Sequence, residues 1–123
     1  MPADDRSPSE TVPEYTLNDY QAAASRTLAP ERRLDNNSLA MVGLGLAGET
    51  GEVVDLIKKV VAHDHPLDRR KLVLEMGDVL WYITALATLL EVPLETVAFT
   101  NIEKLKKRYP NGFDSARSRN RSD

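Results

Sequence analysis

The sequence predicts an all-α fold, a four-helix, antiparallel, bundle-like protomer that assembles into an oligomer. Apolar residues recur at spacings of three and four along most of the chain, and no stretch alternates apolar and polar residues as a half-buried strand does. Turn-forming segments divide this pattern into four parts. Four amphipathic helices separated by turns are typical of a small antiparallel bundle.

The first two helices have recognisable start and stop signals. The first is expected to begin after Thr16, which with Asp19 resembles an N-terminal capping box, and to end before Pro30. Its apolar face consists of Leu17, Tyr20, Ala24 and Leu28. The second helix is expected over residues 38–62, and the loop-forming segment 63–68 ends it. Its candidate caps are Asn36, Asn37 and Ser38.

The last two helices follow directly. The third is expected to begin after Asp68 and to stop before Val92 and Pro93. Its unbroken apolar stripe consists of Leu72, Met76, Val79, Ile83, Leu86 and Leu90. The fourth helix is expected from about Leu94 to Arg108 and ends near the turn-forming residues 109–112.

The third helix is too apolar to be covered by one neighbouring helix. Residues 79–90 carry no charge on any side, and Trp81 points roughly opposite the predicted stripe. A second subunit is therefore expected to cover the remaining face, which makes the protein a homo-oligomer, either a dimer or a tetramer.

One domain is expected over residues 15–113, between two flexible tails. Residues 1–14 and 114–123 lack the apolar content that would order them. The N-terminal segment carries acids and has no apolar run, so it does not resemble a secretory signal. No segment approaches the length of a membrane span. These features predict a cytoplasmic protein with no membrane partner.

Composition excludes several kinds of site. The chain has no cysteine and only 2 histidines, so disulfides and thiolate metal sites are impossible and structural zinc is nearly excluded. The net charge is -3, and no basic face is broad enough to follow a nucleic-acid backbone, so no nucleic-acid partner is expected. Setting aside the four acids described next changes the net charge to +1. The acidity of the protein is thus largely the acidity of one site.

Glu49 occupies a position that the helical pattern reserves for an apolar residue. The stripe of the second helix consists of Val42, Leu46, Val53, Leu56 and Val60, and its missing member is Glu49. An ionised carboxylate at such a position needs a compensating positive charge. No Lys or Arg lies between Val42 and Asp55, so a metal ion is the favoured partner.

Two pairs of acids share this geometry. Glu49 and Glu52 are three residues apart, as are Glu75 and Asp78, so each pair projects to nearly one side of its helix. Both pairs lean the same way from their apolar stripes. If the two helices pack as a hairpin, the four carboxylates could line one groove. A solvated surface is the alternative interpretation of each pair taken alone.

The donor set indicates the kind of metal. Four clustered carboxylates repel one another unless cations neutralise them, and oxygen ligands favour Mg²⁺, with Mn²⁺ also possible. A di-iron bundle would place Glu-x-x-His on its helices, whereas His63 and His65 lie in the predicted loop.

Glycines and basic residues add to the pattern. Four glycines interrupt the second helix at a cost of about 1 kcal/mol each relative to Ala, which suggests that they permit close approach of a ligand or a backbone. They are Gly43, Gly45, Gly48 and Gly51.

On the fourth helix, Lys104 and Arg108 share one side and could bind phosphates together, although a solvated basic face is the commoner role of such a run.

Three segments resemble a known family. Residues 45–59 (GLAGETGEVVDLIKK), 74–83 (LEMGDVLWYI) and 101–113 (NIEKLKKRYPNGF) resemble the MazG-like nucleotide pyrophosphohydrolases of the all-α NTP pyrophosphatase group. The resemblance implies oligomers with sites formed across subunits and a role in nucleotide-pool house-cleaning. It implies that the catalytic, Mg²⁺-binding residues are Glu49, Glu52, Glu75 and Asp78. It also implies that Lys104, Arg108 and Asn101 face the polyphosphate.

The implied reaction is hydrolysis of an NTP or dNTP between the α and β phosphates, which yields the nucleoside monophosphate and pyrophosphate. Glu52 is the candidate proton acceptor, and Gln21 and Arg26 are candidate nucleoside contacts. The alternative function is a non-catalytic helical oligomerisation or interaction module with an acidic surface. A prenyl-diphosphate enzyme is disfavoured, because that chemistry usually displays DDxxD-like clusters in much longer chains.

Overall fold

The computed structural model of the protein describes residues 13–121, which form five helices. They are α1 (Leu17–Ser25), α2 (Asn36–His63), α3 (Arg69–Leu89), α4 (Leu94–Arg108) and α5 (Ser115–Arg119). No strand forms among these residues, so the all-α prediction is confirmed. The expected N-terminal tail falls almost wholly outside the described residues.

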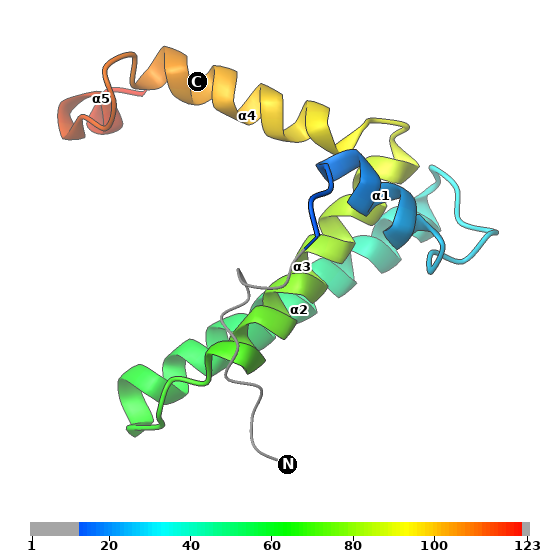
Figure 1. Ribbon diagram of the computed structural model, residues 1–123, viewed down its shortest axis with the longest axis horizontal. Coiled ribbons are helices and arrows are strands. Elements are labelled where there is room, and N and C mark those ends of the chain that lie inside the picture. Colours follow the sequence, from blue (N-terminus) through cyan, green and yellow to red (C-terminus); the bar gives the residue numbers. More distant parts are fainter. Residues whose placement is uncertain (1–12, 122–123) are drawn as a thin grey trace.

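The two longest helices, α2 and α3, pack side by side as an antiparallel hairpin (Figure 1). Asp35 caps α2 by accepting a hydrogen bond from the Ser38 backbone N–H at 2.7 Å. The expected caps lie inside the helix, because Asp35, one residue earlier, supplies the carboxylate at the last non-helical position. At the other end Asp64 ends α2 with a φ of 58°, and Asp68 caps α3 as predicted.

The predicted apolar stripe of α2 lies on the side that is withdrawn from solvent. Val42 is buried, and the other four members of the stripe are half-buried. By contrast, Leu44 and Val61 on other sides of the helix are 71% and 80% exposed. Glu49 is half-buried among the stripe residues, as its spacing predicts.

The predicted stripe of α3 is correct at Leu72, Val79 and Leu86 and wrong at its other three positions. Met76 and Leu90 are 54% and 49% exposed, whereas Glu75 is half-buried and Leu89 is buried. The residues withdrawn from solvent at helical spacing are Leu72, Glu75, Val79, Tyr82, Leu86 and Leu89. Large aliphatic side chains misled the prediction, because α3 turns a polar and an aromatic residue toward α2. Glu75 thus occupies a mid-stripe position in α3, as Glu49 does in α2.

Helix α1 packs across the second half of α3 and is held there by polar contacts. The Gln21 side chain donates to the Val92 carbonyl (3.0 Å) and accepts from the Leu94 backbone N–H (2.7 Å). Just after the C-terminal end of α1, the Thr27 hydroxyl accepts a hydrogen bond from the Trp81 indole N–H at 2.7 Å. Contacts within one chain therefore partly cover Trp81, and the second subunit expected to cover the rest of α3 stays a prediction.

A different face of α3 remains uncovered. Met76, Leu80 and Ile83 are 54%, 37% and 36% exposed, and they follow one another at spacings of four and three on the helix. On α2, Met41 and Leu44 are also exposed. These side chains leave apolar surface of the hairpin in contact with solvent.

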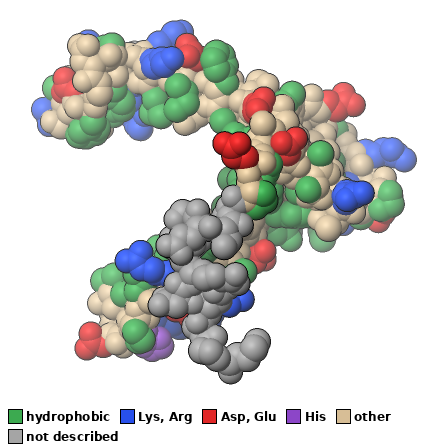
Figure 2. Space-filling view, viewed as in Figure 1, with side chains coloured by type: hydrophobic (Ala, Val, Ile, Leu, Met, Phe, Trp, Pro, Cys, Tyr) green, Lys and Arg blue, Asp and Glu red, His purple; other side chains and the backbone are tan. Residues whose placement is uncertain are grey.

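Helix α4 begins beside α1 and the end of α3 and then extends away from the hairpin (Figure 1). We call α4 and the chain that follows it the α4 arm. Figure 2 shows the hairpin and the α4 arm as two limbs that diverge from a common junction. After Arg108 the chain turns at Gly112, whose φ of 86° suits glycine, and continues into α5. This short helix forms within the segment that was expected to be a flexible tail.

By length and composition alone, α3 could span a membrane, since its mean hydropathy reaches 1.5 over an 18-residue window. The expectation that no segment approaches such a length is therefore wrong. In the fold, α3 packs against α2 and α1, and Glu75 and Asp78 lie in its first half.

Candidate functional site

Three carboxylates converge where α2 and α3 face each other. One carboxylate oxygen from each of Glu49, Glu75 and Asp78 lies within 4.8 Å of the other two. Glu49 and Glu75 are half-buried, because both occupy inward-facing positions of their helices, and Asp78 is exposed at the edge of the cluster. The hairpin therefore brings together acids that lie about 26 residues apart in the sequence.

Glu52, the fourth predicted acid, lies outside this three-residue cluster. It is one turn further along α2 and is exposed. Its charge still acts on the cluster, since it contributes to raising the pKa of Glu49. The structure thus separates three converging acids from one peripheral acid.

The electrostatics of the cluster favour a cation. Partial burial, followed by the negative charges of Asp78, Glu75 and Glu52, raises the pKa of Glu49 above its usual value. The nearest lysines along α2 are engaged elsewhere, because Lys58 and Lys59 pair with Asp55 at 3.3 and 2.8 Å. Three oxygen donors at this spacing suit a hard divalent cation such as Mg²⁺ or Mn²⁺.

One of the four glycines permits a close contact. The ring of Tyr82 on α3 lies where a side chain at position 45 would begin, so only glycine fits there without displacing the ring. A side chain added at Gly43, Gly48 or Gly51 would meet no atom within 4 Å. The expectation of close approach therefore holds at Gly45 within one chain, and the other three glycines face open space.

Tyr20, which the sequence pattern assigns only to the apolar face of the first helix, carries a phenol that interacts electrostatically with the acid cluster. It is half-buried on α1, and its pKa is raised by burial first and then by the charges of Tyr15 and Asp78. In the sequence, Tyr20, Ala24 and Thr27 follow one another at spacings of four and three, so they share one face. Thr27 contacts Trp81 of α3, so this spacing could have indicated that Tyr20 faces α3.

Gln21 and Arg26, the candidate nucleoside contacts of the first helix, do not belong to the acid cluster. Both polar ends of the Gln21 amide are used in hydrogen bonds that join α1 to residues 88–94. Arg26 is the exposed C-cap residue of α1. Gln21 therefore has a structural role in this fold.

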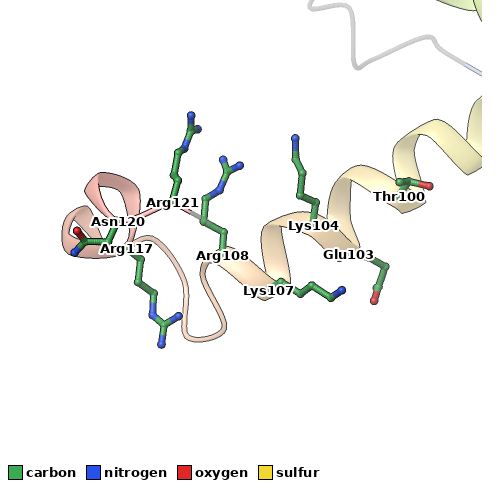
Figure 3. A pocket seen from close by; sticks show the side chains of 8 residues that line it. All are labelled: Thr100, Glu103, Lys104, Lys107, Arg108, Arg117, Asn120 and Arg121. Carbon is green, nitrogen blue, oxygen red and sulfur yellow. The ribbon is translucent and has the colours of Figure 1, made fainter. Parts of the chain in front are cut away.

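The predicted phosphate-binding residues lie on the α4 arm. Lys104 and Arg108 line a pocket at the end of α4, together with Arg117 of α5 and residues 120–121 that follow α5 (Figure 3). Asn101 is exposed on the same helix. Because the arm extends away from the hairpin, a single chain does not bring these residues beside the acid cluster (Figure 1).

The fold and the site define an all-α protein that carries an acidic cluster, able to hold a metal ion, across a helical hairpin. Residues 38–113 match the MazG nucleotide pyrophosphohydrolase domain, and the chain belongs to this family of enzymes. It is also similar to the Gene 37 protein of Mycobacterium phage L5, with 37% identity over 109 residues that span 83% of this chain and 96% of the phage protein. No solved structure matches it.

Proposed function

We propose that the protein hydrolyses nucleoside triphosphates, NTPs or dNTPs, between the α and β phosphates and releases pyrophosphate. The observation that carries this proposal is the convergence of Glu49, Glu75 and Asp78 within 4.8 Å in a chain of the MazG nucleotide pyrophosphohydrolase family. Such a reaction needs a site that neutralises several phosphate charges and activates a water molecule.

The acid cluster would hold the metal ion. Glu49, Glu75 and Asp78 supply oxygen ligands from two helices, and Glu52 lies within electrostatic reach as a further ligand. When bound, Mg²⁺ supplies Lewis-acid activation of water and neutralises charge on the phosphate oxygens. The hairpin keeps the acids in place before the substrate arrives, because both half-buried members sit on inward-facing stripe positions.

Glu52 is the candidate general base. It stands outside the three converging oxygens, so its carboxylate would not be fully engaged by the metal and could accept the proton of the attacking water. The water oxygen then forms a bond to phosphorus while the bond to the α–β bridging oxygen breaks. Pyrophosphate leaves, and the nucleoside monophosphate is the second product.

Substrate binding would require a second copy of the chain. The α4 arm carries Lys104, Arg108 and Asn101 away from the acids of its own hairpin (Figure 1). The hairpin in turn leaves Met76, Leu80 and Ile83 uncovered. A homo-oligomer in which one copy's arm approaches another copy's hairpin would cover apolar surface and place phosphate-binding cations opposite the acids.

The test is turnover of a panel of NTPs and dNTPs with Mg²⁺ by the purified protein, with pyrophosphate and orthophosphate detected separately. We expect pyrophosphate release that stops in EDTA and falls by about a hundredfold or more in Glu49→Gln. Glu31→Gln, an exposed acid outside the cluster, serves as the matched control and should retain activity. Release of orthophosphate alone, or the absence of turnover with every nucleotide, would refute the proposal.

A further inference from the structure

The end of the α4 arm carries a concentration of positive charge that the two predicted phosphate ligands do not account for. Seven cationic side chains and one acid, Asp114, lie between residues 104 and 121, whereas the whole chain has a net charge of -3. Five of these cations line one pocket, namely Lys104, Lys107, Arg108, Arg117 and Arg121. The pocket is thus strongly positive, although the whole chain has a negative net charge.

The turn between α4 and α5 builds this pocket. Gly112 reverses the chain with a φ of 86°, and the rings of Tyr109 and Phe113 pack at 5.4 Å across the turn. Asp114 then caps α5 by accepting a hydrogen bond from the Ala116 backbone N–H at 2.8 Å. These contacts bring residues 117–121 back beside the last two turns of α4.

Cations outnumber acids among the described residues that line the pocket. Glu103 is the acid among the lining residues, and its carboxylate already accepts from Lys106 at 3.3 Å. Figure 3 shows Lys104, Arg108 and Arg121 pointing to the same side, with Lys107 and Arg117 directed to the other. Arg121 therefore adds a third cation to the side that already holds Lys104 and Arg108.

The size of the pocket indicates a compact ligand. Its volume is about 570 Å³, within the range of sites that hold small molecules. Arginine and lysine at this density suit a small anion with several charges, because guanidinium groups bind phosphate oxygens in pairs and ammonium groups add point charges.

We propose that the α4–α5 pocket is a polyphosphate-binding site in which Arg121 is a third anion ligand beside Lys104 and Arg108. The proposal rests on the proposed function only for its physiological ligand, the polyphosphate chain of a nucleotide. Binding itself needs no metal and no acid cluster, since all three ligands belong to the arm.

The test is isothermal titration of the full-length protein with inorganic tripolyphosphate in EDTA, at about 0.15 M ionic strength, where diffuse surface attraction is screened. Arg121→Gln should weaken binding by about tenfold, as expected for loss of a hydrogen bond between charged groups. Arg119→Gln removes the same charge two residues away, at a position that does not line the pocket, and should change binding less than about twofold.

Three results would overturn the proposal: no tripolyphosphate binding by the wild type, equal losses in the two variants, or no loss in Arg121→Gln. Tighter binding of a single-stranded oligonucleotide, weakened equally in both variants, would also overturn it in favour of a nucleic-acid surface. Tripolyphosphate binding that depends on Arg121, without turnover of any nucleotide, would support the pocket and refute the proposed function. Pyrophosphate release with the same KM in wild type and Arg121→Gln would do the reverse.

Discussion

The ring of Tyr82 on α3 occupies the space beside Gly45 on α2 where a side chain would otherwise begin. Gly45 lies four residues before Glu49, and Tyr82 lies four residues after Asp78. The contact is therefore one helical turn from the acid cluster on both helices. It sets the distance between α2 and α3 next to the converging carboxylates.

Gly45→Ala should destabilise the protein, although alanine is the better helix former by about 1 kcal/mol. The added methyl group would collide with Tyr82, and the hairpin would have to open beside the cluster. Gly43→Ala is the control, because a side chain there meets no atom within 4 Å, and it should stabilise by up to about 1 kcal/mol. Urea unfolding measures both changes. A double-mutant cycle with Tyr82→Leu should recover the loss at position 45, and additive effects would contradict the assigned contact.

Mg²⁺ should raise the melting temperature of the wild type, because a ligand bound only to the folded state stabilises by about 2.7 kcal/mol at a hundred times its Kd. Glu75→Gln should abolish most of this shift and, in EDTA, should melt above the wild type, since it removes one of the repelling charges. Glu31→Gln should retain the full Mg²⁺ response. Thermal unfolding in EDTA and in Mg²⁺ separates these effects, and an equal response of all three proteins argues against a metal site at the cluster.

The stability of the metal-free protein should fall as the pH rises through the titration of Glu49. Its pKa is raised above the usual 4.5 by burial and by the charges of Asp78, Glu75 and Glu52. A carboxyl group whose pKa is raised by folding stabilises the folded state fully below pH 4.5, its usual pKa. This contribution to the free energy of unfolding is lost as the pH rises through the raised pKa of the folded state. In EDTA, wild type and Glu49→Gln should melt together below that range, and the wild type should melt lower at neutral pH. A difference that does not change with pH would contradict this assignment.

Gln21→Met should destabilise the protein by about 2 kcal/mol, because it leaves the backbone N–H of Leu94 and the carbonyl of Val92 without their hydrogen-bond partner. Leu94 is only 4% exposed, so water cannot fully replace the lost bond. Asn37→Met, at an exposed position in the first turn of α2, should change stability by less than about 0.5 kcal/mol. Denaturant unfolding measures both, and similar values for the two would exclude a structural role for Gln21.

Activity should return when two inactive variants are mixed under conditions that exchange subunits. Glu49→Gln lacks an acid of the hairpin, and Lys104→Gln lacks a cation of the arm, so a mixed oligomer contains sites in which both partners are intact. Pyrophosphate release from the mixture, compared with each variant alone, measures the recovery. A mixture that stays inactive, although both variants are oligomeric, would mean that the arm does not complete a neighbouring site.

Much of the local structure could be predicted because it depends on neighbouring residues. Thr16 and Asp19 form the expected capping box, Asp68 caps α3, and α4 has the predicted bounds. The stripe of α2, including Glu49, was predicted because its burial comes from one partner helix and one helical face. Each of these features is encoded within a few residues of where it forms.

The sequence pattern failed where a helix has more than one neighbour. Helix α3 contacts α2 on one face and α1 on another, so three of its buried residues, Thr84, Ala85 and Ala87, are small, and Leu89 is the large aliphatic one. No periodicity of α3 alone reveals that Glu75 and Tyr82 face α2. The role of Gln21 was missed for the same reason, since its partners lie about 70 residues away.

The chain alone was sufficient for the all-α class and for the presence of two spaced acid pairs, because helical spacing and charge are properties of short segments. Only the packed structure decided that Glu49, Glu75 and Asp78 converge while Glu52 stays peripheral, and that the basic residues leave on a separate arm. Those outcomes depend on how helices rotate and cross when they bury their surfaces together, and this is a property of the whole fold.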